Sequence, residues 1–179
     1  PTPGDLRAFD VVDLIHSGWL TEIAKALTWL GSTAVLLPLI VLVASVLAFN
    51  GRWTEFLVLS LGAISTWLGV DLLKELIDRP RPDGGLVAVS SSSYPSGHSA
   101  HSVFYVWLAV TIAIRLRPDM ARKAALVTAG IAVTAVVGLT RVYLHVHYLS
   151  DVFGGWALGA FCFSFFAVVA LLAGQLRKN

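Results

Sequence analysis

The sequence predicts an all-α protein: a polytopic bundle of transmembrane helices that forms a single membrane-embedded domain over residues 1–179. Two observations predict this class. The chain is 56% hydrophobic and only 13% charged, whereas an average soluble domain has about 25% charged residues. Long runs without a charged residue also recur along the chain, and little amphipathic helix remains that would cover them in a soluble protein.

Five of these runs reach the length of a membrane span once their flanks are included. A spanning helix needs about 20 mostly apolar residues. Short connections separate most of the runs: Gly51 and Arg52 form a turn after the first, and Asp119 stands where it would cap the fourth. The expected spans are 33–50, 54–74, 100–115, 123–141 and 151–175.

Residues 1–31 follow a different pattern. Their apolar residues recur at helical spacing, with Asp10, Asp13, Glu22 and Lys25 between them. A helix with one apolar and one charged face lies in the membrane interface rather than across the membrane. We therefore expect interfacial helices on the outer surface of the bundle.

The connection over residues 75–100 is the only long one. Proline and glycine recur through it, and they exclude one continuous helix there. Residues 91–102, "SSSYPSGHSAHS", close this connection and are unusually polar for a segment between two apolar spans. Groups of this kind are costly to place near hydrocarbon, which indicates a function for them.

The basic residues predict the orientation of the bundle. Positive residues concentrate in cytoplasmic connections, and five alternating spans put three basic groups on one side. The connection 75–100 and the N-terminal segment then face the non-cytoplasmic side. The three groups are Arg52; Arg115, Arg117, Arg122 and Lys123; and Arg177 and Lys178.

The net charge of +2 is too small to indicate a nucleic-acid partner.

Three polar groups, which we call islands, map to the non-cytoplasmic surface. The first is "KELIDRPRP", the second is "YPSGHSAH" and the third is "TRVYLHVHYLSD". Lysine offers a point charge and arginine a planar fork, and both suit phosphate oxygens. In the second island Ser96 stands where it would cap the following helix, and Gly97 leaves its backbone N–H open to an anion. His98 can give or take a proton.

The third island contains a base and a residue that can orient it. His147 and Asp151 are four residues apart, so on a helix they share one face. A carboxylate that accepts the Nδ1–H of an imidazole fixes its tautomer and leaves Nε2 free to attack. This pairing predicts a nucleophilic histidine.

Each residue also has a simpler explanation. The basic side chains of the first island could extend to lipid headgroups, Asp151 could serve only as a helix cap, and the histidines of the second island could be surface residues. His145 and His147 form an H-x-H pair of the kind that sometimes binds metal. The third island adds no cysteine and only one carboxylate to that pair. The occurrence of three islands on one side argues against these explanations taken together.

The three islands resemble the signature of the type 2 phosphatidic acid phosphatase superfamily. That signature has Lys, six residues and Arg-Pro; then Pro-Ser-Gly-His; then Ser-Arg, five residues, His, three residues and Asp. Here the order and the gaps agree throughout, and the one departure is Thr140 in place of serine. The resemblance covers the chain from about residue 10 to its end. Members with this layout usually have six spans, so a further span is expected before residue 1.

The resemblance implies a role for each matching residue. His147 would form a phosphohistidine, Asp151 would orient it, and His98 would protonate the leaving oxygen. Water would then hydrolyse the intermediate, with no metal and no other cofactor. Arg79, His101 and His145 fall outside the signature and are expected around the pocket. The residues implied to bind phosphate are Lys74, Arg81, Ser96, Gly97 and Arg141.

The expected function is therefore hydrolysis of a lipid phosphate in an integral membrane protein, at the non-cytoplasmic interface. Phosphatidic acid, phosphatidylglycerophosphate and a polyprenyl diphosphate all suit such a site, and the short outer connections favour a bacterial cell membrane. Vanadium-dependent haloperoxidases share the signature but are larger soluble proteins, and a non-catalytic lipid transporter would not need the complete set. The sequence leaves the oligomeric state open.

Overall fold

The described part of the chain consists of helices and the connections between them, and it contains no strand. The computed structural model describes residues 1–116 and 118–176. Five of its helical segments are long and apolar enough to cross a membrane. This confirms the predicted all-α bundle of transmembrane helices. The elements are α1 (Pro3–Ile15), α2 (Gly18–Thr28), the 3₁₀ turn η1 (Trp29–Gly31), α3 (Thr33–Phe49), α4 (Trp53–Ile77), α5 (Gly97–Ser102), α6 (Phe104–Leu116), α7 (Met120–Tyr143) and α8 (Leu149–Leu176).

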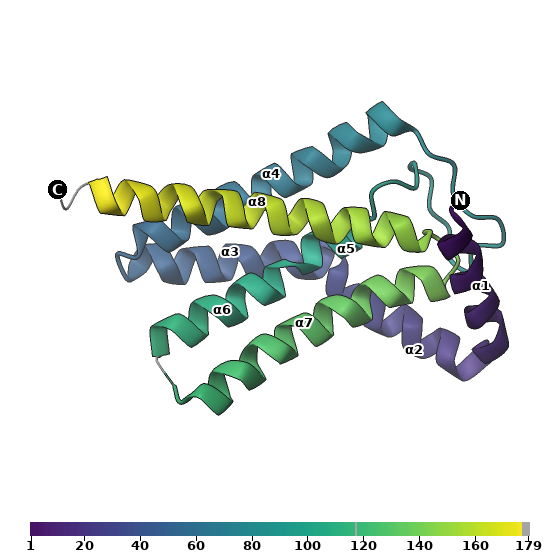
Figure 1. Cartoon of the computed structure of the whole chain (residues 1–179), viewed down its shortest axis with the longest axis horizontal. Helices are drawn as coiled ribbons and strands as arrows, with labels where there is room; N and C mark the ends of the chain where they lie inside the picture. Colours follow the sequence, from purple (N-terminus) through teal and green to yellow (C-terminus); the bar gives the residue numbers. More distant parts are fainter. Residues whose placement is uncertain (117, 177–179) are drawn as a thin grey trace.

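The first expected span, 33–50, agrees with α3 over Thr33–Phe49. By length and composition the candidate spanning segment also includes α2 and η1, over Gly18–Phe49. The charged residues of α2 hid this continuity in the sequence. The tight turn η1 joins α2 to α3 at an angle, and α2 leans against α7 (Figure 1). Ser32 then caps α3 by accepting a hydrogen bond from Val35 N.

The other boundaries are close to those expected. Asp119 caps α7 as predicted, because its side chain accepts a hydrogen bond from Arg122 N at 3.0 Å. The long connection is shorter than the predicted 75–100, since α4 continues to Ile77 and ends with Asp78 in the left-handed region at φ 40°. Only residues 78–96 are non-helical there.

Large apolar side chains cover the outside of the bundle. Phe161 is 66% exposed and Leu171 is 69% exposed, both on α8, and such faces suit contact with lipid chains. The interior holds two apolar clusters. One lies along the middle of α3, α4 and α8 and includes Leu59 and Phe163. The other contains apolar residues of the third island, among them Tyr143, packed against α1 and α2.

The polar connections gather at one end of the bundle. The connections α4–α5 and α7–α8 lie at this end, and α1 lies across it (Figure 1). The turn between α3 and α4, the connection from α6 to α7 and the end of α8 lie at the opposite end. Basic residues of the described chain at that opposite end are Arg52, Arg115, Arg122 and Lys123. Arg117, Arg177 and Lys178 lie outside the described residues.

Helix α5 approaches α8 closely because α8 carries glycines there. A Cβ at Gly155 would come within 2.4 Å of Ser96 O, and one at Gly159 would come within 2.4 Å of Ala100 O. A side chain at either position would therefore force the two helices apart. These glycines bring the second island against the start of α8, where the third island ends.

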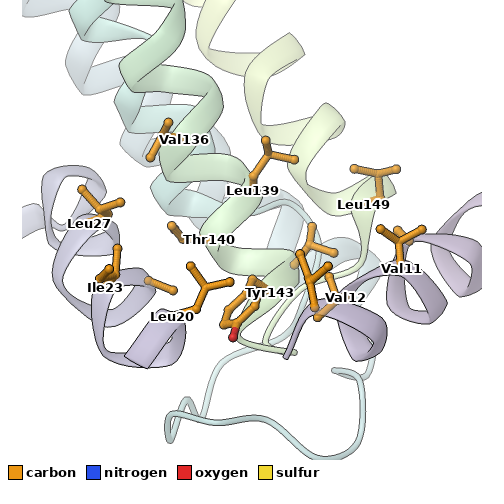
Figure 2. A pocket seen from close by; sticks show the side chains of 14 residues that line it. Val11, Val12, Leu20, Ile23, Leu27, Val136, Leu139, Thr140, Tyr143 and Leu149 are labelled. Atoms are coloured by element: carbon orange, nitrogen blue, oxygen red, sulfur yellow. The ribbon is translucent and has the colours of Figure 1, made fainter. Parts of the chain in front are cut away.

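An apolar groove of about 480 Å³ lies between α1, α2 and α7. Figure 2 shows Leu20, Ile23 and Leu27 of α2 facing Val136 and Leu139 of α7 across it. Among the described residues no charged side chain lines it, so the groove suits hydrocarbon and not phosphate.

Candidate active site

His147 lies in the short connection between α7 and α8, at the polar end of the bundle. It is 2% exposed, and its backbone N–H donates to Arg141 O at 3.3 Å. Its Nε2 lies 3.2 Å from Nη1 of Arg81. Its Nδ1 faces Asp151 Oδ2 at 3.5 Å, the outer limit of a hydrogen bond, and has no closer partner among the described residues.

Asp151 is fully buried in the first turn of α8 and is held from three sides. Oδ2 accepts hydrogen bonds from the Ser93 hydroxyl and from Tyr148 N, the latter at 2.9 Å. Oδ1 accepts from Nη1 of Arg79 at 2.5 Å. The carboxylate thus combines the capping role of our simpler explanation with an orientation toward His147.

Two of the three basic residues of the first island, Lys74 and Arg81, converge on the serines before Pro95. Lys74 Nζ donates to Ser92 O at 2.5 Å and to Ser91 Oγ at 3.3 Å. Arg81 donates to the same two serines, through Nε to Ser91 O at 2.6 Å and through Nη2 to Ser92 O at 3.3 Å. The serine run therefore folds around both cations. The first island also reaches the third, because Arg81 Nη1 donates to Val146 O at 2.5 Å.

Arg141 is buried near the end of α7, at 4% exposure. Its Nη1 donates to Thr28 Oγ1 of α2 at 2.9 Å, and its Nε has no partner among the described residues. A buried guanidinium with an unused donor is costly, so this N–H is available to an anion. The neighbouring Thr140 hydroxyl donates within α7, to Val137 O at 2.6 Å.

The second island forms the start of α5 and reaches the third island through its backbone. Ser96 caps α5 as predicted, because its Oγ accepts from Ser99 N and Ser99 Oγ. Ser96 N in turn donates to Asp151 O at 3.0 Å. Gly97 and His98 follow in the first turn and are half-buried. A Cβ at Gly31 would approach His98 O to 3.0 Å, so η1 lies directly against this turn.

All eight predicted residues therefore lie at the polar end of the bundle. Direct contacts join Arg81, His147 and Asp151, and Lys74 is tied to Arg81 through the serine run. Backbone hydrogen bonds attach the other predicted residues to this group. Ser96 N donates to Asp151 O, with Gly97 and His98 following Ser96 along the chain, and His147 N donates to Arg141 O.

Two histidines outside the signature face other partners. His101 stacks on Trp67 with ring centroids 4.2 Å apart. His145 stacks on Phe9 of α1 at 4.6 Å and lies 3.4 Å from Asp13. His145 and His147 therefore point to different sides of the connection, and His145 serves to dock α1.

The sequence reasoning missed two residues that shape the site, Asp5 and Ser93. Arg79 was expected around the pocket. Arg79 contacts both Asp151 and Asp5, and Ser93 donates to Asp151. The "RPRP" pattern did signal Arg79, but nothing in the sequence relates Asp5 to a residue 146 positions away.

Comparisons with known proteins identify the family of this chain. The family model of the PAP2 superfamily matches residues 55–174. Phosphatidylglycerophosphatase B of Bacillus subtilis (strain 168) is 36% identical over 154 residues, which cover 84% of this chain and 75% of that protein. Decaprenylphosphoryl-5-phosphoribose phosphatase of Mycobacterium tuberculosis (strain ATCC 25618 / H37Rv) is 35% identical over 132 residues, which cover 68% of this chain and 65% of that protein.

A solved structure is also similar over most of the chain. The crystal structure of a transmembrane PAP2 type phosphatidylglycerolphosphate phosphatase from Bacillus subtilis superposes with a TM-score of 0.83 at 34% identity. The superposition covers 92% of this chain and 83% of that one. The matched segment 55–174 contains all three islands, from Lys74 to Asp151. The chain therefore belongs to the PAP2 superfamily, and it is an integral membrane phosphatase.

Proposed function

We propose that the chain hydrolyses the phosphate monoester or diphosphate of a lipid through a phosphohistidine at His147. The contact between Arg81 and His147 carries this proposal. Arginine can only donate hydrogen bonds, so the Nε2 that faces it at 3.2 Å must present its lone pair. The imidazole proton then sits on Nδ1, toward Asp151. This tautomer has the unprotonated Nε2 that an attack on phosphorus requires.

The charge state of His147 supports the same role. Burial lowers the pKa of His147, the neighbouring Asp151 raises it, and Arg81 and Arg141 lower it again, to about 4. The imidazole is therefore neutral at pH 7. A neutral imidazole keeps the electron pair that a protonated one lacks.

Positive side chains around Nε2 would hold the phosphoryl group. Lys74 and Arg81 converge from the first island, and Arg141 offers its unpaired Nε from α7. Donors that are already in place stabilise the charge of a transferring phosphoryl group without reorganising. In this proposal they do the work that a divalent metal does in other phosphatases, and Ser96 and Gly97 add the N-terminal turn of α5.

The reaction proceeds in two transfers. Nε2 of His147 forms a bond to phosphorus while the bond to the leaving oxygen breaks, and His98 gives that oxygen its proton. Water then attacks the phosphohistidine, His98 takes a proton from it, and the bond between phosphorus and Nε2 breaks. Inorganic phosphate leaves, and both histidines return to their starting states. Asp151 stabilises the positive charge on His147 in each transfer.

The position of the site favours a lipid substrate. It lies at one end of a bundle whose sides are apolar. A bilayer around those sides would bring phosphate headgroups to this end. A curated relative that shares 36% identity is named for phosphatidylglycerophosphate. Among the three candidate substrates, we therefore place phosphatidylglycerophosphate first and expect the site on the non-cytoplasmic side.

Phosphate release from a panel of lipids in detergent tests this proposal. The panel contains phosphatidylglycerophosphate, phosphatidic acid and a polyprenyl diphosphate, each with and without EDTA. We expect release from at least one lipid, unchanged by EDTA, and inhibition by vanadate, which adopts the geometry of the transferring group. Activity that EDTA abolishes and added metal restores would contradict the mechanism. Halide oxidation with added vanadate, without lipid hydrolysis, would favour a haloperoxidase instead.

A further inference from the structure

Arg79 lies between two buried carboxylates. Its Nη1 donates to Asp151 Oδ1 at 2.5 Å, and its Nη2 donates to Asp5 Oδ2 at 3.1 Å. Nη1 also donates to Ser150 Oγ at 2.7 Å, and the guanidinium carbon lies 4.2 Å from the centre of the Tyr148 ring. The planar fork therefore joins the start of α8 to the start of α1, a geometry that a point charge cannot reproduce.

Asp5 is fixed at least as firmly as Arg79. It is 1% exposed, although it is the third residue of the N-terminal helix α1. Its Oδ1 accepts from Ser150 N at 2.8 Å, and its Oδ2 accepts from Ser150 Oγ at 2.9 Å and from Thr2 N at 2.7 Å. One carboxylate thus completes the capping box of α1 and binds the first turn of α8.

The contact with Arg79 determines the orientation of the Asp151 carboxylate. Asp151 is fully buried, and a buried carboxylate needs a partner at each oxygen. Arg79 occupies Oδ1, which leaves Oδ2 to Ser93, Tyr148 N and the side that faces His147. If Arg79 were absent, Oδ1 would be unpaired and the carboxylate would turn toward another donor. The approach of Oδ2 to His147 Nδ1 would then be lost.

We propose that Arg79 is a positioning residue for the pair formed by His147 and Asp151, and that Asp5 holds Arg79 in place. The inference rests on the proposed role of His147 as nucleophile. It assigns the N-terminal helix α1 a part in the reaction, although α1 lies outside the segment matched by the family model.

Arg79 and Arg81 contact different parts of the site. The donors of Arg79 point to Asp5, Ser150 and Asp151, whereas Arg81 contacts Nε2 of His147, where phosphate would bind. Loss of Arg79 should therefore slow phosphohistidine formation without weakening substrate binding. Loss of Arg81 should affect both.

Steady-state kinetics and rapid-quench ³²P labelling on the full chain in detergent test the proposal. Removing a partner that orients a metal-binding histidine typically costs about 10- to 100-fold in activity, and we expect a loss of the same order for Arg79. We expect Arg79→Gln to lower kcat and the labelling rate by that factor with KM unchanged, and Asp5→Asn to cause a smaller loss of the same kind. Asp10→Asn is the matched control, because Asp10 is exposed on the same helix and should leave both constants unchanged.

A readout that a purely structural role would not move is chemical rescue. In Arg79→Ala, added guanidinium should restore part of kcat, because the ion can bind between the two carboxylates. Arg79→Lys should keep part of the activity if Arg79→Ala does not fold. Asp5→Asn should cost little more in the Arg79→Gln background, because its effect passes through Arg79.

The outcomes separate this inference from the proposed function. An unchanged kcat in Arg79→Gln, with or without a rise in KM, would overturn the positioning role. So would the absence of guanidinium rescue in Arg79→Ala. His147→Ala is measured in parallel. If His147→Ala still forms the labelled enzyme, the proposed nucleophile is wrong, whatever Arg79 does.

Discussion

At the scale of single residues, the two histidines of the site meet different neighbours. His147 is almost fully buried between Arg81 and Asp151, and both of its ring nitrogens face a charged group. His98 is half-buried at the start of α5. A nucleophile needs a fixed orientation and a defined tautomer, whereas a general acid must exchange protons with water. The difference in burial therefore supports the separate roles proposed for them.

Replacing each histidine should give different defects. His147→Ala should abolish turnover of every substrate and the acid-labile phosphoenzyme. His98→Ala removes only a positioned acid, which is worth roughly 10²- to 10⁴-fold, and the loss should shrink for p-nitrophenyl phosphate, whose leaving group needs no proton. Rapid-quench ³²P labelling measures both effects. Label that maps to Ser96 or His98 would contradict the assignment.

Asp5 should make stability depend on pH in an acidic range. Burial alone would raise the pKa of Asp5, but hydrogen bonds from Thr2, Ser150 and Arg79 lower it from 3.8 to about 2. A lowered carboxyl pKa stabilises the fold above pH 4, and the contribution is lost as pH falls toward 2. The shift corresponds to about 2 kcal/mol.

Asp5→Asn should therefore lower the thermal midpoint at pH 6 and have little effect near pH 2. Thermal unfolding in detergent across this range measures the difference from the unmodified chain. Asp10→Asn, on the exposed face of α1, should not show it. A difference that stays constant from pH 2 to pH 6 would mean that Asp5 does not stabilise the fold as an ionised group.

At the scale of elements, the site depends on how closely α5 packs against α8. Ser96 lies at the start of α5 and Asp151 at the start of α8, and a backbone hydrogen bond joins them. Gly155 and Gly159 allow this approach, because backbone oxygens of residues 96 and 100 occupy the space that a Cβ would take. A backbone atom cannot move aside as a flexible side chain can.

Gly159→Ala should therefore push α5 away from α8 and destabilise the protein by about 1–3 kcal/mol, the usual cost of overpacking. Gly174→Ala on the same helix is the control, because a Cβ there meets no atom of residues 1–116 and 118–176 within 4 Å. The control should be neutral or stabilising by up to about 1 kcal/mol, since alanine favours helix more than glycine does. Thermal unfolding in detergent compares the two, and equal midpoints would show that α5 adapts without cost.

At the scale of the whole molecule, the two ends of the bundle differ in chemistry. The islands and α1 lie at one end, and the described basic residues of the turn α3–α4 and the connection α6–α7 lie at the other. Basic residues concentrate in cytoplasmic connections. The bundle should therefore expose its site to the outside of the cell membrane.

Cysteine labelling tests this orientation in a variant that lacks the buried Cys162. Asp83→Cys lies in the exposed connection after α4, and Met120→Cys lies at the exposed start of α7. An impermeant maleimide should label the first in intact cells and the second only after lysis. The reverse pattern would place the proposed chemistry on the cytoplasmic side.

The sequence by itself was sufficient to predict the helix bundle and the location of eight candidate site residues at one end of it. Apolar length defines a spanning helix locally, and the three islands match their signature at fixed spacings, so neither inference needs a long-range contact. The sequence was less successful for α2. Its charged residues suggested an interfacial helix, whereas α2 continues through η1 into α3 as one apolar segment and packs against α7.

The tertiary structure alone decided which residues hold the site together. Asp5, Thr28 and Ser93 come from three separate segments, and each binds a member of the site or the arginine beside it. Buried charges must find partners wherever the fold provides them, and such partners need not follow any spacing in the sequence. Fixed spacing along one helix or turn can be read from the chain, whereas contacts between helices exist only once the helices have packed.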